Sequence, residues 1–113
     1  MNIFETYLDK IIELIKSAKE KNLLELPENL SGINVDIPPP KFNCDMSTNV
    51  AMVLSKSNNK SPLEVAEVIV DIIKKDDDHI EEIKIEKPGF INLKFKKIFW
   101  NNFLKSIINE KNY

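Results

Sequence analysis

The sequence has little of what marks secreted, membrane-spanning or metal-binding proteins. Its 113 residues include one cysteine, Cys44, and one histidine, His79, so neither an internal disulfide nor a metal site of paired cysteines and histidines can form. No apolar run approaches the roughly 20 residues that a membrane helix needs. Acidic residues also interrupt the apolar stripe near the N-terminus, unlike a signal peptide. We therefore expect a cytoplasmic domain without a membrane partner.

Glycine and arginine are also scarce, and each scarcity excludes a class of site. With two glycines in total, the chain contains neither of the glycine-rich loops that hold nucleotide phosphates. No motif places a histidine beside Cys44, so we expect no catalytic residue, no metal and no cofactor in this chain. Arginine is absent, and sixteen lysines against eighteen acidic residues give a net charge of −2. Any nucleic-acid contact must therefore come from a local patch.

The residues that are present predict one packed domain, since 42% are hydrophobic and 30% are charged. Apolar spacing of three and four residues predicts helices, and alternation predicts strands. The expected helices cover residues 3–19, 47–56, 62–75 and 99–108, and the expected strands cover 33–37, 41–43, 83–86 and 91–96. The acidic run 76–78, which follows the expected helix over residues 62–75, is expected to be a solvated loop. The order α-β-β-α-α-β-β-α indicates an α+β fold, with a four-stranded antiparallel or mixed sheet and helices on one face.

Two helix starts carry capping signals. Ser61 is followed by Pro62 and Glu64, the arrangement in which a serine caps a helix and a glutamate three residues later completes a capping box. Asp45 or Ser47 is the expected cap of the helix over residues 47–56.

The second strand of the hairpin carries the most informative side chains. Its apolar residues alternate with an outward row of four: Phe90, Asn92, Lys94 and Lys96. Single-stranded RNA loops are recognised by such groups, because a ring stacks on a base, an amide bonds its edge and ammonium groups hold phosphates. An ordinary solvated strand face has the same spacing, and from spacing alone that second interpretation is favoured.

Three blocks resemble one known family. Residues 88–93, Pro-Gly-Phe-Ile-Asn-Leu, are similar to the Pro-Gly-Phe-Ile-Asn-Phe segment of the N-terminal additional domain of arginyl-tRNA synthetases. Residues 44–56 and 61–66 resemble two helix starts of the same domain, in the same order and spacing. The departures are Cys44, where the family usually has glycine, and Met46, where an aromatic residue is common.

The resemblance implies a domain over residues 1–97 and a helix over 98–113 that leads toward an absent catalytic domain. It implies contact with the dihydrouridine loop of arginine tRNA through Phe90 and Asn92, with no DNA partner, and the lysine row adds Lys94 and Lys96. The residues expected to have a structural capping role are Asp45, Ser47, Asn49 and Ser61. A longer parent enzyme would use ATP and Mg²⁺ to join arginine to its tRNA. The alternative is a free-standing RNA-binding or protein-interaction module with this fold.

Overall fold

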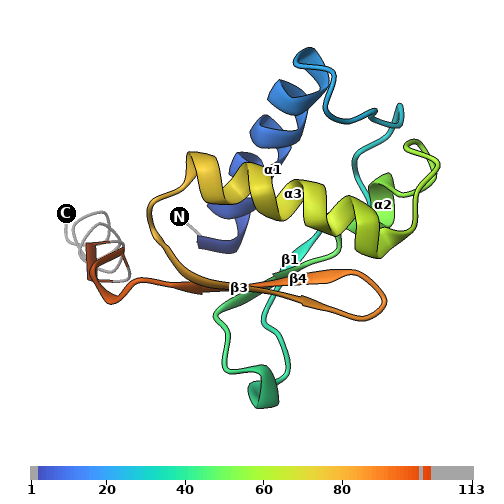
Figure 1. Cartoon of the computed structure of the whole chain (residues 1–113). Helices are drawn as coiled ribbons and strands as arrows, with labels where there is room; N and C mark the ends of the chain where they lie inside the picture. Colours follow the sequence, from blue (N-terminus) through green and yellow to red (C-terminus); the bar gives the residue numbers. More distant parts are fainter. Residues whose placement is uncertain (1–2, 100, 103–113) are drawn as a thin grey trace.

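The computed structural model describes residues 3–99 and 101–102. Its elements in chain order are α1 (Ile3–Glu20), β1 (Val35–Asp36), the 3-10 helix η1 (Pro40–Phe42), β2 (Met46–Thr48), α2 (Val50–Leu54), α3 (Pro62–Asp76), β3 (Ile80–Glu86) and β4 (Phe90–Phe95). The strands form one sheet in the order β1-β2-β4-β3, and every pair is antiparallel. Figure 1 shows α1, α2 and α3 on one side of this sheet and η1 on the other. The expected α+β fold is confirmed.

Helix α1 forms because its apolar residues recur on one face, and that face closes the core. The residues it buries are Ile3, Tyr7, Ile11, Ile15 and Ala18. Helix α3 is capped by Ser61, whose hydroxyl oxygen accepts a hydrogen bond from the Glu64 backbone N–H at 3.2 Å. Because Pro62 cannot donate a backbone hydrogen bond, its place at the first turn leaves no donor unsatisfied.

The helix-facing side of the sheet is apolar apart from Thr48 of β2. Met46 of β2 lies opposite Leu93 of β4, and Ile83 of β3 pairs with the same Leu93. One level along, Ile91 pairs with Ile85 and with Thr48. The core therefore lies between this face and the three α-helices.

The segment around the second predicted helix differs from expectation. Residues 46–48 form β2, and only Val50–Leu54 are helical, so the predicted start at residue 47 is wrong. Asp45 explains the difference, because its backbone N–H bonds Leu93 O and its carboxylate accepts from Phe95 N–H, each at 2.8 Å. These bonds hold the segment against β4, and a three-residue strand is too short for its period to be recognised in sequence.

The structure also differs from three further predictions. Residues 40–42 form η1 rather than a strand, since consecutive prolines hold the chain and Asn43 ends the turn in the left-handed region at φ 50°. Asp77 is buried rather than solvated. Residues 97–99 and 101–102 are helical, so the terminal helix begins at residue 97, before the expected starts at residues 98 and 99. Trp100, Phe103 and the positions after it lie outside the described residues. Among the described helices, none has the length and hydropathy of a membrane span.

Candidate nucleic-acid interface

The face of the sheet turned away from the α-helices carries a polar row at its centre. The register places Asp36, Ser47, Asn92 and Lys84 side by side, one from each strand in the order β1, β2, β4 and β3. Next to this row, toward the hairpin turn, Glu86 pairs with Phe90. The segment between β1 and β2, which contains η1, lies on this side of the sheet (Figure 1).

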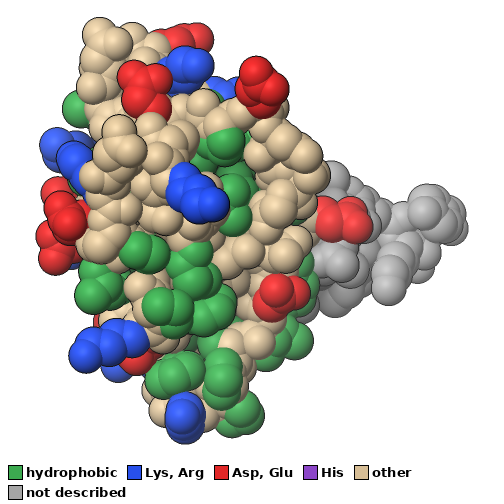
Figure 2. All heavy atoms as spheres, turned by 90° about the vertical axis from the view of Figure 1, so that its right-hand side faces the viewer, with side chains coloured by type: hydrophobic (Ala, Val, Ile, Leu, Met, Phe, Trp, Pro, Cys, Tyr) green, Lys and Arg blue, Asp and Glu red, His purple; other side chains and the backbone are tan. Residues whose placement is uncertain are grey.

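A cavity of about 400 Å³ lies between this row and the η1 segment. Its lining residues are Asp36, Ile37, Pro38, Pro39, Lys41, Phe42, Ser47, Asn49, Glu86, Lys87, Phe90 and Asn92. Figure 2 views the side of the molecule with the hairpin end, and hydrophobic side chains gather over its lower part with charged groups around them. A pocket with apolar walls and a few polar groups is the usual form of a small-ligand site.

Phe90 lines this cavity and is partly exposed to solvent. It is the first residue of β4, and the residue stays 39% exposed although it is a large aromatic. The hairpin turn beside it packs tightly, because a methyl group on Gly89 would come within 2.6 Å of Pro62 Cβ at the start of α3. The ring is therefore presented from a well-supported turn.

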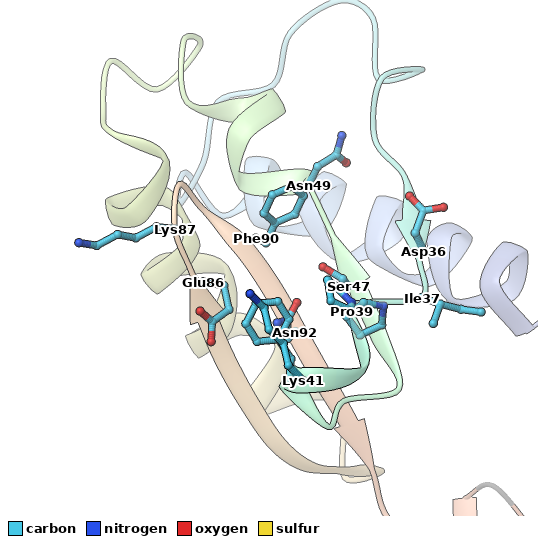
Figure 3. Close-up of a pocket in the computed structure, with 12 residues that line it drawn as sticks. Asp36, Ile37, Pro39, Lys41, Ser47, Asn49, Glu86, Lys87, Phe90 and Asn92 are labelled. Carbon is cyan, nitrogen blue, oxygen red and sulfur yellow. The ribbon is translucent and has the colours of Figure 1, made fainter.

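Asn92 lies on the predicted face, but it is not exposed as expected. Only 1% of the residue is accessible, and neither its amide nitrogen nor its amide oxygen has a hydrogen-bond partner among the described residues. The sequence prediction of exposure is wrong because β2 and β3 flank the residue and the η1 segment lies over it. Such a buried group costs about 1–3 kcal/mol unless something bonds it. Asn92 points among the cavity-lining side chains (Figure 3).

The two predicted lysines do not line this cavity. Lys94 is half-buried and its ammonium lies 3.9 Å from the Glu81 carboxylate, and Lys96 is exposed just beyond the end of β4. The cavity has Lys41 and Lys87 instead. Sequence reasoning missed both. Lys87 could have been found from its place in the turn before Phe90, whereas only the folded η1 segment brings Lys41 to the site.

Asp45 and Ser47, two of the residues expected to cap the second helix, have different roles. Ser47 belongs to β2 and lines the cavity, and Asp45 bonds β4, so neither caps α2. The hydroxyl of Thr48 accepts from Val50 N–H at 3.3 Å. Asn49 is the N-cap residue of α2, and its side chain bonds the neighbouring loop instead of the helix, accepting from Asn34 N–H at 2.7 Å and donating to Gly32 O at 2.9 Å.

A second polar cluster lies at the far end of the sheet, around buried Asp77. Its carboxylate accepts from the Tyr7 hydroxyl and the Lys10 ammonium, both at 2.9 Å, and from the His79 backbone N–H at 2.8 Å. Burial raises the pKa of Asp77, but these donors outweigh it and hold that pKa below its ordinary value. Burial is the main cause that raises the pKa of Tyr7, and the negative charge of Asp77 raises it further.

Neither sequence candidate for catalysis gains support from its surroundings. The His79 ring lies 3.1 Å from the Asp77 carboxylate and 4.9 Å from the Phe99 ring centroid, so it belongs to this structural cluster. Burial is the main cause that raises the pKa of the Cys44 thiol, which disfavours a reactive thiolate. Among residues 3–99 and 101–102, no group of three acidic, histidine or cysteine side chains could hold a metal ion.

Comparison with known proteins places this arrangement in a family. The family model described as "Arginyl tRNA synthetase N terminal domain" matches residues 6–95. The arginine–tRNA ligase of Pelagibacter ubique is 61% identical over 114 residues, which cover 100% of this chain and 20% of that protein. The arginine–tRNA ligase of Bartonella henselae is 39% identical over 97% of this chain and 19% of its own length.

The chain thus spans about a fifth of the length of these relatives. A solved structure of arginyl-tRNA synthetase from Plasmodium falciparum overlaps 82% of this chain and 16% of its own, with a TM-score of 0.60 at 23% identity. That similarity supports the fold. The family match over most of the chain leads to one conclusion: the chain belongs to the arginyl-tRNA synthetase N-terminal domain family.

Proposed function

We propose that this chain binds arginine tRNA by taking one base of the dihydrouridine loop into the Phe90–Asn92 cavity. The observation that carries the proposal is Asn92, a buried amide whose two polar atoms have no partner among the described residues, in the lining of a cavity. A buried polar group of this kind is rare in a native structure and calls for an explanation. A ligand that enters the cavity and bonds the amide would supply one.

A nucleobase matches the chemistry of the cavity. Its flat face can stack on the half-exposed Phe90 ring, and such stacking contributes roughly 1–3 kcal/mol. Its edge carries donors and acceptors side by side, and the Asn92 amide offers one of each type in the same plane. The apolar wall that includes Ile37 and Pro39 excludes water from the base.

The family context supports transfer RNA as the source of that base. The relatives are named arginine–tRNA ligases, and the chain matches about a fifth of their length. We infer that the chain recognises tRNA for a longer enzyme, which would join arginine to its tRNA with ATP and Mg²⁺ bound in a separate catalytic domain. Phe90 and Asn92 would then support arginylation through tRNA binding alone.

The test compares Phe90→Ala with Ile91→Ala. Phe90→Ala should weaken binding of an arginine tRNA transcript by about tenfold or more, at ~1.4 kcal/mol per decade, and leave the melting temperature nearly unchanged. Ile91 is fully buried, so Ile91→Ala should lower the melting temperature first and binding only through unfolding. If Phe90→Ala melts the domain yet spares binding by the folded fraction, the base-stacking role is wrong.

A further inference from the structure

Two lysines on separate elements border the cavity. Lys41 belongs to η1 and Lys87 to the turn between β3 and β4, and both are exposed. Figure 3 shows them on these two segments, with the Lys87 side chain extending outward from the turn and Lys41 drawn near Asn92. They are distant in sequence, so only the fold places both residues at the border of one cavity.

These two ammonium groups are available for an anion. Neither has an ion pair within the part of the chain that the structure describes. By contrast, Lys84 lies 3.8 Å from Glu82 and Lys94 lies 3.9 Å from Glu81. The Lys41 ammonium lies 5.1 Å from the centroid of the Phe42 ring, a contact that holds the charge beside the cavity wall without neutralising it.

The cavity also has acidic neighbours, and they restrict where phosphate can lie. Asp36 borders the cavity from β1 and Glu86 borders it from β3. Their carboxylates repel a phosphate, so the favourable positions at the opening are those beside Lys41 and Lys87. The charges thus define two separate anion positions rather than one diffuse basic patch.

An RNA loop presents two such anions when it inserts one base. Each nucleotide within a strand has a phosphate on its 5′ side and another on its 3′ side, and both stay outside when the base is buried. We propose that Lys41 and Lys87 bind the two phosphates that flank the inserted nucleotide, so that the strand crosses the cavity from the hairpin turn to η1. This inference rests on the proposed function, and it replaces Lys94 and Lys96 as the phosphate contacts.

The experiment measures binding of a labelled arginine tRNA transcript to the 113-residue chain over a range of salt concentrations. Lys41→Gln and Lys87→Gln should each weaken binding at low salt and reduce the slope of log affinity against log salt by about 0.7, the value for one phosphate of a single strand. The double variant should lose about twice as much slope. Lys94→Gln and Lys96→Gln are the matched controls and should leave the slope unchanged.

The outcomes separate this inference from the proposal beneath it. If Phe90→Ala loses affinity while only the Lys94 and Lys96 variants change the slope, the base site stands and the two-lysine path is overturned. A loss of affinity at Lys41 or Lys87 with an unchanged slope would also overturn it, because phosphate neutralisation must alter the salt dependence. If Phe90→Ala binds as the unmodified chain does, the proposed function itself fails.

Discussion

At the scale of single residues, the unbonded amide of Asn92 is unfavourable for stability, and the proposed binding role would explain why it is there. In the free domain the buried Asn92 amide has no hydrogen-bond partner among the described residues. Its neighbours in the ladder are Ser47 and Lys84. An apolar side chain of similar size would suit the free domain better, since it leaves no polar group unpaired. Proteins often keep a residue of this kind where binding requires it, at a cost in stability.

Asn92→Leu should therefore stabilise the free domain and abolish RNA binding. Removing an unsatisfied amide should raise the free energy of unfolding by about 1 kcal/mol, which raises the melting temperature of a domain this size by about 4–8 °C. Thermal unfolding followed by circular dichroism measures this. The control is Asn49→Leu, which breaks two hydrogen bonds to the neighbouring loop and should destabilise by about 1–3 kcal/mol. A destabilised Asn92→Leu variant would mean that the amide is satisfied in solution.

At the scale of elements, the hairpin end depends on close packing against the helices. A methyl group added at Gly89 would meet the Pro62 Cβ at 2.6 Å and the Met52 Cγ at 3.3 Å, so the turn lies directly on α2 and α3. The position of Phe90, one residue later, follows from this contact. The site is thus held by an interface between elements as well as by the ladder.

Gly89→Ala should displace the turn and destabilise the domain by about 1–3 kcal/mol, the usual cost of overfilling a packed contact. It should also weaken tRNA binding in the folded fraction, because Phe90 moves with the turn. Gly32→Ala is the matched control, since its added methyl group would meet only Val53 Cγ2 at 3.8 Å, an ordinary contact. Chemical denaturation of both variants gives the comparison, and equal stability for the two would contradict the tight packing at Gly89.

Asp77 joins three elements, since it ends α3, bonds Tyr7 and Lys10 of α1, and bonds the backbone just before β3. Its pKa is lowered in the folded state, so the unfolded chain binds the proton more tightly. The stability it contributes is therefore fully present above the ordinary carboxyl pKa of about 4, and it is lost as the pH falls through the lower folded-state pKa.

Asp77→Asn should lower the free energy of unfolding at pH 7 by about 1.5–3 kcal/mol, the range for hydrogen bonds to a charged group. The difference from the unmodified chain should shrink as the pH falls below about 4, because the native carboxylate is then protonated too. Urea unfolding at a series of pH values measures both effects. Asp78→Asn, at the exposed neighbour, should change little. If the difference in free energy of unfolding between Asp77→Asn and the unmodified chain stays constant down to about pH 2, the charged network around Asp77 is wrong.

At the scale of the whole molecule, the described residues form a sheet face that borders a cavity, which we propose as the RNA site, and a helical layer that builds the core. The sequence offers no glycine-rich loop for phosphates, and its length is about a fifth of that of its ligase relatives. The 113-residue chain should accordingly show no arginine-dependent exchange of pyrophosphate into ATP, while it still binds arginine tRNA. Pyrophosphate exchange above the background of a chain-free control would contradict the proposal that a separate domain catalyses arginine activation.

Local patterns in the sequence were enough to predict the elements whose signals repeat along the chain. Helix α1 was expected over residues 3–19 and ends at Glu20, and α3 was expected over residues 62–75 and ends at Asp76. The hairpin and the placement of Phe90 and Asn92 on the face away from Ile91 also followed from alternation. These features are local, because a helix or strand repeats its burial pattern every few residues.

The construction of the site, in contrast, depends on how distant segments pack. Asn92 is buried because β2, β3 and the η1 segment surround it, and Lys41 reaches the cavity because the prolines and left-handed Asn43 shape that segment. Asp77 is a buried partner of α1 rather than a solvated loop residue. Burial and partners of this kind come from segments far apart in the chain, so no local period records them. Spacing can predict which face a side chain takes, but only packing determines what covers that face.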